Sequence, residues 1–299
     1  MLTPDKVAEA VRFVIEALSA PDRVIERTGM GNLHAALAPA LETWVEECGG
    51  TRDILLVSAS GSVNYNLTTE DSDLDLKAAY LPTLEDFYHN RFPKFNLVTP
   101  EFDCEVQAVH KFVHHTMKGH INAFEPLYAK SSLADPDFAH IMNLGLKPLV
   151  EMNVMSTVRA CYFSAVQTDA EAVANGWKPR KAAHALRFLL FLITLLDRGQ
   201  FDYVLHEPLK TAILNVKIGK TSRGEYVPLF DELLDTAKTM AFRYVNSGND
   251  YVFTDRVIEL DERSSPEWEK LRAWVDAEMI DLVRQPIESS FRNAYIAAE

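Results

Sequence analysis

Cysteine, long apolar runs and positive charge are all scarce in this 299-residue sequence. Its three cysteines, Cys48, Cys104 and Cys161, form an odd number without metal-like spacing, so a reducing cytoplasm suits them best. The most apolar segment, residues 188–196, is far shorter than the roughly 20 residues that span a bilayer. The first residues include an early acid, which is unlike a secretory signal. We therefore expect a cytoplasmic protein without a membrane segment.

Positive charge is the next scarcity, because 30 lysines and arginines stand against 43 acidic residues and leave a net charge of −13. A protein that holds a long nucleic acid through its phosphates normally carries a basic face, so no extended DNA-binding surface is expected. A small nucleotide held through bound Mg²⁺ is compatible with this acidity, because the metal supplies the positive charge.

What the chain does have is a stretch of chemistry-bearing residues between Gly61 and Asp75. The apolar run at residues 54–57 predicts a buried strand, and Gly61 and Ser62 follow it closely. Asp73 and Asp75 open a second apolar run, and alternate residues of a strand face the same way. Two such carboxylates repel each other unless a cation lies between them, and Mg²⁺ prefers oxygen ligands. A polar hairpin is the alternative, and the preceding Gly-Ser favours the metal site.

A third acidic position is predicted on a later strand. Residues 102–107 alternate apolar and polar side chains, as in a strand with one polar face. Asp103 and Glu105 lie on that polar face, and either could reach the same metal. Because both point the same way, the sequence leaves the choice between them open. A strand that merely faces solvent is the alternative.

A basic helix is predicted over residues 177–199, with Gly199 at its end. Arg180, His184 and Arg187 share one face at spacings of four and three, and Lys181 lies beside them. A solvated basic face is the commoner explanation of such a pattern. Four cationic or near-cationic residues within eight positions of an acidic protein favour instead a counter-charge for a triphosphate.

The remaining segments set the architecture. Apolar residues recur at helical spacing over residues 4–20 and over 32–48, where Asn32 is a candidate cap. Residues 84–101 predict either a short helix with a loop or an added hairpin. From about residue 133 nearly all of the chain is predicted to be helical. Lys217, Lys220 and Arg223 either extend the basic face or are simply solvated.

The order of Gly-Ser, Asp-x-Asp and an acidic strand resembles the signature of the nucleotidyltransferase superfamily related to DNA polymerase beta. The resemblance covers about residues 52–130 and 177–235. Within it, three segments look like a narrower group, the predicted nucleotidyltransferases of bacteria and their phages. Matching positions are Tyr65, Leu67, Thr68, Ser72, Asp73, Lys111, Phe112, Lys118, Gly119, Glu125, Lys181, His184 and Arg187. His120-Ile121 stands where that group usually has Asn-Pro.

The resemblance implies an α+β fold in two parts. Residues 1–132 would form the nucleotidyltransferase catalytic domain, a small mixed sheet with flanking helices that include the N-terminal ones. Residues 133–299 would form a mostly helical domain that binds nucleotide and acceptor.

It also implies a magnesium-dependent reaction, in which NMP moves from an NTP to an acceptor hydroxyl and pyrophosphate leaves. Asp73 and Asp75 would bridge two Mg²⁺ ions, or Mn²⁺, with Asp103 or Glu105 completing the set. The phosphates would be held by Gly61, Ser62, Lys181, His184 and Arg187. Two rivals use the same fold: a catalytically silent nucleotide-binding or interaction module, and a metal-dependent phosphohydrolase. The acceptor stays open between an RNA end, a protein and a small molecule.

Overall fold

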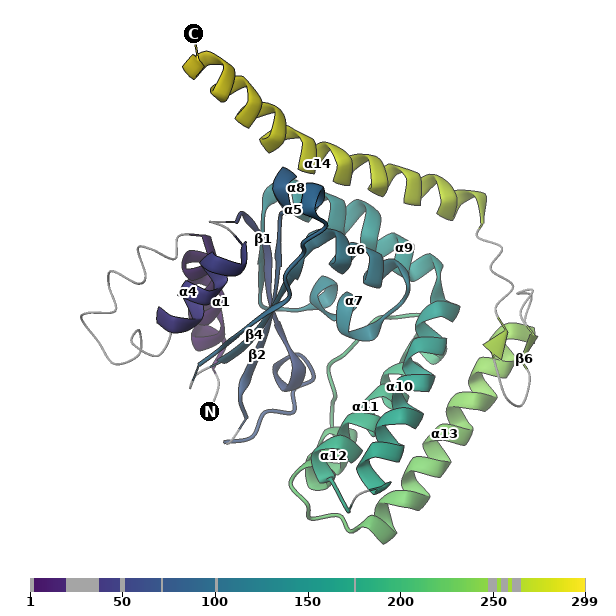
Figure 1. The fold of residues 1–299 in the computed structure, drawn as a ribbon. Coiled ribbons are helices and arrows are strands. Elements are labelled where there is room, and N and C mark those ends of the chain that lie inside the picture. Colours follow the sequence, from purple (N-terminus) through teal and green to yellow (C-terminus); the bar gives the residue numbers. More distant parts are fainter. Residues whose placement is uncertain are drawn as a thin grey trace.

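The computed structural model of the chain describes residues 3–19, 38–48, 52–70, 72–99, 102–174, 176–246, 252–253, 258–259 and 265–298. The architecture is α+β, with a five-stranded mixed sheet, flanking helices and a helical C-terminal part (Figure 1). Helices α1 (Pro4–Ser19) and α4 (Ala38–Cys48) precede the first strand. The sequence predicts both, although the expected cap at Asn32 lies outside the described residues.

The sheet has the strand order β3-β4-β2-β1-β5. Its strands are β1 (Ile54–Ser60), β2 (Leu74–Tyr80), β3 (Phe95–Val98), β4 (Phe102–Ala108) and β5 (Ser132–Ala134). Strands β2 and β4 run parallel, and the other neighbouring pairs are antiparallel. The domain boundary predicted between residues 132 and 133 therefore falls within β5, which pairs with β1.

The two faces of the sheet have different characters, as the period-two pattern predicts. One face packs against α1 and α4 and contributes apolar residues such as Leu76, Cys104 and Val106 to a core with Trp44. The helices α6 (Val109–Met117) and α7 (Ile121–Tyr128) lie on the other side (Figure 1). On that side the strands β2 and β4 carry polar residues, and these form the floor of the site described below.

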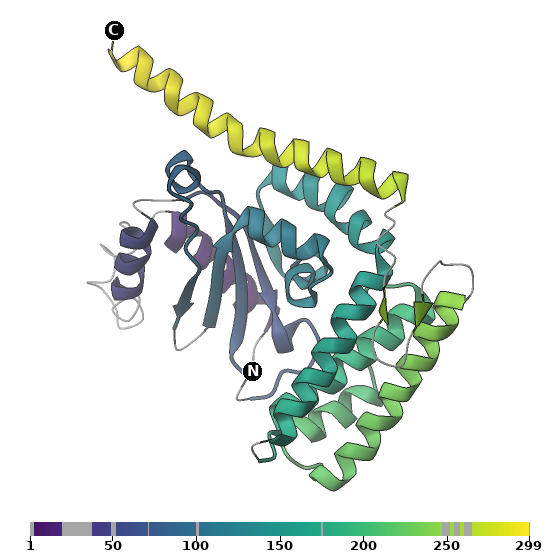
Figure 2. The same ribbon diagram turned by 45° about the vertical axis from the view of Figure 1, so that its right-hand side comes forward.

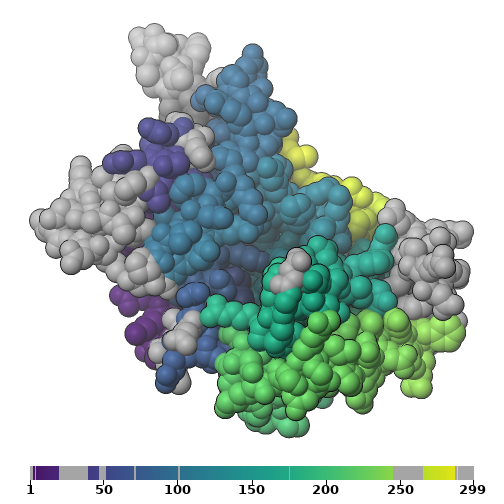
Figure 3. All heavy atoms as spheres, turned by 60° about the horizontal axis from the view of Figure 1, so that its bottom comes forward, coloured from purple at the N-terminus to yellow at the C-terminus, as the bar shows by residue number. Residues whose placement is uncertain are grey.

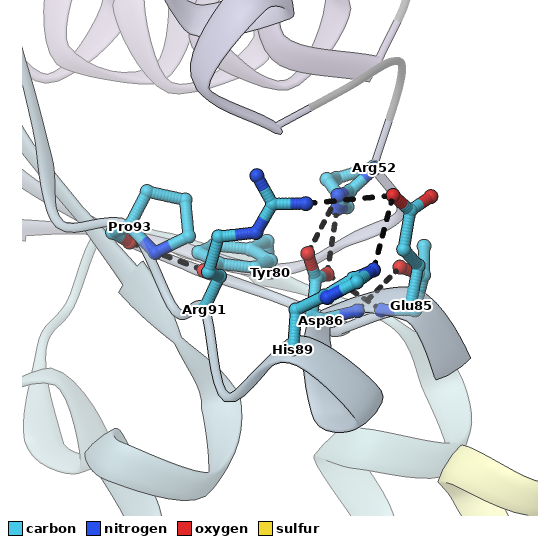
Figure 4. Close-up of polar contacts among 8 residues, drawn as sticks. Arg52, Tyr80, Glu85, Asp86, His89, Arg91 and Pro93 are labelled. Atoms are coloured by element: carbon cyan, nitrogen blue, oxygen red, sulfur yellow. Dashed lines mark hydrogen bonds and ion pairs between the residues drawn. The ribbon is translucent and has the colours of Figure 1, made fainter.

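The segment after β2 contains both structures that the sequence leaves open. It forms the short helix α5 (Leu84–His89) and then β3, which makes a hairpin with β4. Thr83 and Asp86 form a capping box at the start of α5. The Asp86 carboxylate also accepts two hydrogen bonds from the guanidinium of Arg52, at 3.0 and 2.9 Å (Figure 4). This buried ion pair fixes α5 to the segment that enters β1.

The helical part follows β5. It contains α8 (Pro136–Ile141), a π-helical turn η3 (Met142–Leu146), α9 (Lys147–Met152), α10 (Val154–Ala174), α11 (Pro179–Arg198), α12 (Leu209–Lys217), α13 (Arg223–Asn246) and α14 (Pro266–Ala298). A short two-stranded ribbon, β6 (Val252–Phe253) with β7 (Ile258–Glu259), lies between α13 and α14.

The most buried of these helices is α11, which packs against α10, α12 and α13 (Figure 2). It ends where the sequence predicts, because Gly199 takes a left-handed conformation with φ of 63°. No described helix has the length and apolar character needed to cross a membrane.

The helical part is held against the connection between β1 and β2. The Leu205 N–H donates to the carbonyl of Tyr65, and Lys217 Nζ donates to the carbonyl of Leu67, at 3.2 and 2.8 Å. Figure 3 shows the green helical part lying directly beside the blue residues of the sheet part. This docking places the first turns of α11 opposite the polar face of the sheet.

Candidate active site

A cavity of about 640 Å³ lies between the polar face of the sheet and the first turns of α11. All of the site residues predicted from sequence line it except Lys181. Those brought together are Gly61, Ser62, Asp73, Asp75, Asp103, Glu105, His184 and Arg187. They come from segments more than a hundred residues apart, which only the docking of the helical part unites.

The parallel register of β2 and β4 separates the two candidates for the third carboxylate. Asp75 lies directly opposite Asp103, while Glu105 lies opposite Lys77. Glu105 Oε1 is 3.1 Å from the ammonium of Lys94, so this acid already has a counter-ion. Asp103 is therefore the lateral neighbour of Asp75, and Glu105 lies one pleat farther along the sheet.

The carboxylates of Asp73, Asp75 and Asp103 form no ion pair with any described residue. Burial raises the pKa of Asp75, and the neighbouring charges of Asp103, Glu125 and Asp73 raise it further. Within the described ranges no group of three or more His, Cys, Asp or Glu side chains is arranged to hold a metal ion. The beginning of strands β2 and β4 is thus a negative site that lines the cavity, and no cation of the described residues lies within ion-pair distance of these three carboxylates.

The position of Gly61 accepts only glycine, because of its backbone conformation and the nearby side chain of Asp75. Its φ is +64°, in the left-handed region, and a Cβ built there would lie 2.2 Å from Asp75 Oδ2. Any other residue would therefore be strained and would push the carboxylate away. Gly61 opens the 3₁₀ turn Gly61–Val63, which places Ser62 at the cavity.

Arg187 is a buried cation on the wall of the cavity that faces the sheet. Its side chain is 9 % exposed, and the guanidinium carbon lies 3.5 Å from the ring centre of Tyr65. Arg187 Nη2 is 2.6 Å from His184 Nε2, while Nε has no partner. Among the described residues no carboxylate lies within ion-pair distance of Arg187. A buried guanidinium in this state has the charge and the free donor that an anion requires.

The sequence predicts a near-cationic His184, whereas its surroundings in the structure favour the neutral imidazole. Burial, together with the nearby charges of Arg187, Lys77 and Lys181, lowers its pKa to about 3. The imidazole is therefore neutral at pH 7, and its Nε2 accepts a hydrogen bond from Arg187. It orients the guanidinium instead of adding a charge.

The remaining cations of α11 and α12 divide between the cavity and the surface. Lys181 is exposed, pairs with Glu171 of α10 and does not line the cavity, so its contact with phosphate stays a prediction. Arg180 and Lys217 line the cavity instead. Lys217, whose role the sequence leaves open, donates to Ser72 Oγ at 3.2 Å as well as to the Leu67 carbonyl.

Glu125 is one of the lining residues that the sequence-based site omits. It lies in the predominantly apolar helix α7 and its side chain is buried. An acid within an apolar helical run is the signal that identifies it, since such a residue must have partners in the core.

Comparison with known proteins adds no family assignment: neither the family models nor the curated proteins searched include a match to this chain. The chemistry of the cavity is therefore argued from its own side chains.

Proposed function

We propose that this protein is a metal-dependent nucleotidyltransferase with the fold of the superfamily related to DNA polymerase beta. One observation carries the proposal. Carboxylates without a described cationic partner face a buried guanidinium without a described carboxylate partner, across one cavity. The two sets do not neutralise each other directly. A triphosphate with bound divalent metal satisfies both, because its metal suits the carboxylates and its phosphates suit Arg187.

The donor chemistry fits magnesium or manganese. Asp75 and Asp103 are register neighbours, so this pair would hold the metal, and Asp73 lies two residues before Asp75 at the same cavity. Mg²⁺ commonly takes one or two carboxylates together with waters and substrate phosphates, and does not require a cage made entirely of protein. When bound, two such ions would neutralise phosphate charge and lower the pKa of the acceptor hydroxyl.

The chain itself would bind and orient the triphosphate. Gly61 lets the backbone approach closely, and the Ser62 hydroxyl is available to a phosphate oxygen at the same turn. Arg187 lies over the ring of Tyr65 and offers a planar fork to a phosphate, while Arg180 and Lys217 add positive charge. Positioning and charge stabilisation make up most of the catalysis of phosphoryl transfer. The products would be a nucleotidylated acceptor and pyrophosphate.

ATP labelled at either the α- or the γ-phosphate tests this proposal. The protein is incubated with Mg²⁺ or Mn²⁺ and, in turn, with RNA ends, proteins and small hydroxyl compounds, and the other NTPs follow. We expect the α label to move to an acceptor and the γ label to appear in pyrophosphate. Asp75→Asn should abolish both signals, and Arg198→Ala, at an exposed position of α11, is the matched control.

Two outcomes would replace the proposal. Release of the γ label as inorganic phosphate would assign a phosphohydrolase. Tight binding of ATP without turnover with any acceptor would assign a silent nucleotide-binding module.

A further inference from the structure

The carboxylate of Glu125 binds the turn that begins at Gly61. Its side chain is 2 % exposed, and Oε1 accepts hydrogen bonds from the Gly61 N–H at 2.8 Å and from Asn64 Nδ2 at 3.1 Å. Asn64 Nδ2 also donates to the carbonyl of Ala59, at the end of β1. One oxygen therefore ties α7 to both ends of the turn between residues 61 and 64.

Burial of this charge is unfavourable unless it is compensated. The nearest cation is Lys77, whose Nζ lies 3.9 Å from Glu125 Oε2 and donates to the carbonyl of Asn122. Glu125 also disfavours ionisation of Asp75, since its charge helps to raise the pKa of that group. A buried acid with this cost does not simply fill space in an apolar helix.

The bond to Gly61 has a specific mechanical consequence. Gly61 combines a left-handed φ of +64° with an approach to Asp75 that leaves no room for a Cβ. Glycine has more backbone freedom than any other residue, so its conformation must be imposed by its partners. The Glu125 carboxylate supplies that constraint, because its Oε1 accepts the hydrogen bond of the Gly61 N–H.

We propose that Glu125 is a positioning residue that holds the Gly61–Ser62 turn in the conformation that receives the phosphates. It acts through Gly61 and Asn64 and does not contact the phosphates itself. This inference rests on the proposed function, because it assigns the turn to a triphosphate.

Three variants and one control separate positioning from simple support of the core. Glu125→Ala removes the acceptor, and Glu125→Asp keeps the charge but withdraws it by one methylene. Glu125→Gln keeps an oxygen that can accept from the Gly61 N–H. Thr116→Val is the control, because Thr116 is equally buried and donates from α6 to the carbonyl of Ala123 in α7, away from the turn.

The binding of MgATP and of magnesium tripolyphosphate is measured by calorimetry for each protein. Tripolyphosphate carries no base or sugar, so it reports on the phosphate site alone. We expect Glu125→Ala and Glu125→Asp to weaken both ligands by about tenfold to a hundredfold, as for loss of a charged hydrogen-bonding group at a preorganised site. Glu125→Gln should restore most of the affinity, and Thr116→Val should lower the Tm without weakening either ligand.

Hydrogen exchange at the Gly61 amide gives a readout that needs no ligand. The amide should exchange faster in Glu125→Ala and Glu125→Asp, and stay protected in Glu125→Gln. If Glu125→Ala does not fold, the Asp and Gln variants carry the comparison.

Wild-type affinity in Glu125→Ala or Glu125→Asp would overturn this inference and leave the proposed function intact. Failure of the wild-type protein to bind either ligand would instead overturn the proposed function, and the inference with it.

Discussion

Replacing Arg187 with alanine should weaken nucleotide binding strongly and change the stability of the free protein little. The side chain is 9 % exposed, and its removal breaks no ion pair with a described residue. The free protein loses the contact with Tyr65, worth about 0.5–2 kcal/mol, and the hydrogen bond to His184 Nε2, and it is relieved of a buried cation that has no ion-pair partner among the described residues. These effects oppose each other, so we expect the free energy of unfolding to change by about 1 kcal/mol or less.

The effect on the complex should be larger. A charge-assisted contact between the guanidinium and phosphate is worth about 1.5–3 kcal/mol, which corresponds to a Kd raised about tenfold to a hundredfold. At a concentration of MgATP a hundred times its Kd, the wild-type protein gains about 2.7 kcal/mol of stability. A variant with hundredfold weaker binding gains only ~0.4 kcal/mol at the same concentration.

Thermal unfolding with and without MgATP measures this difference. Arg187→Lys keeps the charge but not the planar fork, so its response should be intermediate. Arg198→Ala is the control, because Arg198 is exposed on the same helix and pairs only with the adjacent Asp197 among the described residues. A wild-type response to MgATP in Arg187→Ala would refute the phosphate contact. A large loss of stability without ligand would assign Arg187 a structural role instead.

Three further outcomes are expected. Asp103→Asn should lower turnover by several orders of magnitude and Glu105→Gln by little, because of these two acids only Asp103 lies beside Asp75. Equal, mild effects of both substitutions in a rate assay would show that β4 does not contribute to the site. Asp75→Asn should abolish transfer. It should also stabilise the free protein at pH 7, because the raised pKa of Asp75 means that its ionised form is unfavourable in the fold. The gain in the free energy of unfolding should be up to about 1 kcal/mol after solvent screening. That gain should fade in denaturant titrations as the pH falls towards the ordinary carboxyl range, and a destabilised variant would contradict it. His184 has a pKa of about 3 in the folded protein and 6.5 ordinarily. Between these two pH values the unfolded state binds one more proton than the folded state, so the free energy of unfolding falls as the pH drops through this range. His184→Gln should lose less stability than wild type over that window, and equal pH profiles would show that His184 titrates normally.

Local sequence patterns predict many of the helices and strands and eight of the residues that line the cavity. The alternation in residues 102–107 predicts β4, and Gly199 predicts the end of α11, because these signals depend on neighbours in the chain. The Asp-x-Asp pair and the basic face of α11 predict charge of opposite sign, which the cavity brings together. Helical spacing places Arg187 correctly but does not exclude Lys181, which lies one residue beyond Arg180 and pairs with Glu171.

The remaining features depend on tertiary structure. The choice between Asp103 and Glu105 needs the register of two parallel strands, since alternation alone puts both acids on one face. The neutral state of His184 arises from burial beside Arg187, which has no local signature. Glu125 lies 64 residues after Gly61 in the sequence, so the hydrogen bond between them follows only from the packing of α7 against β1.

A crystal structure with Mn²⁺ and a nonhydrolysable ATP analogue tests the central claim most directly, because Mn²⁺ is located by its anomalous scattering. The account predicts Mn²⁺ bound to the carboxylates of Asp75 and Asp103, at about 2.0–2.3 Å as for hard cations with oxygen ligands. It also predicts that the phosphates of the same ligand contact Arg187. Metal and triphosphate bound elsewhere, with Asp75 and Asp103 left without a ligand, would contradict it.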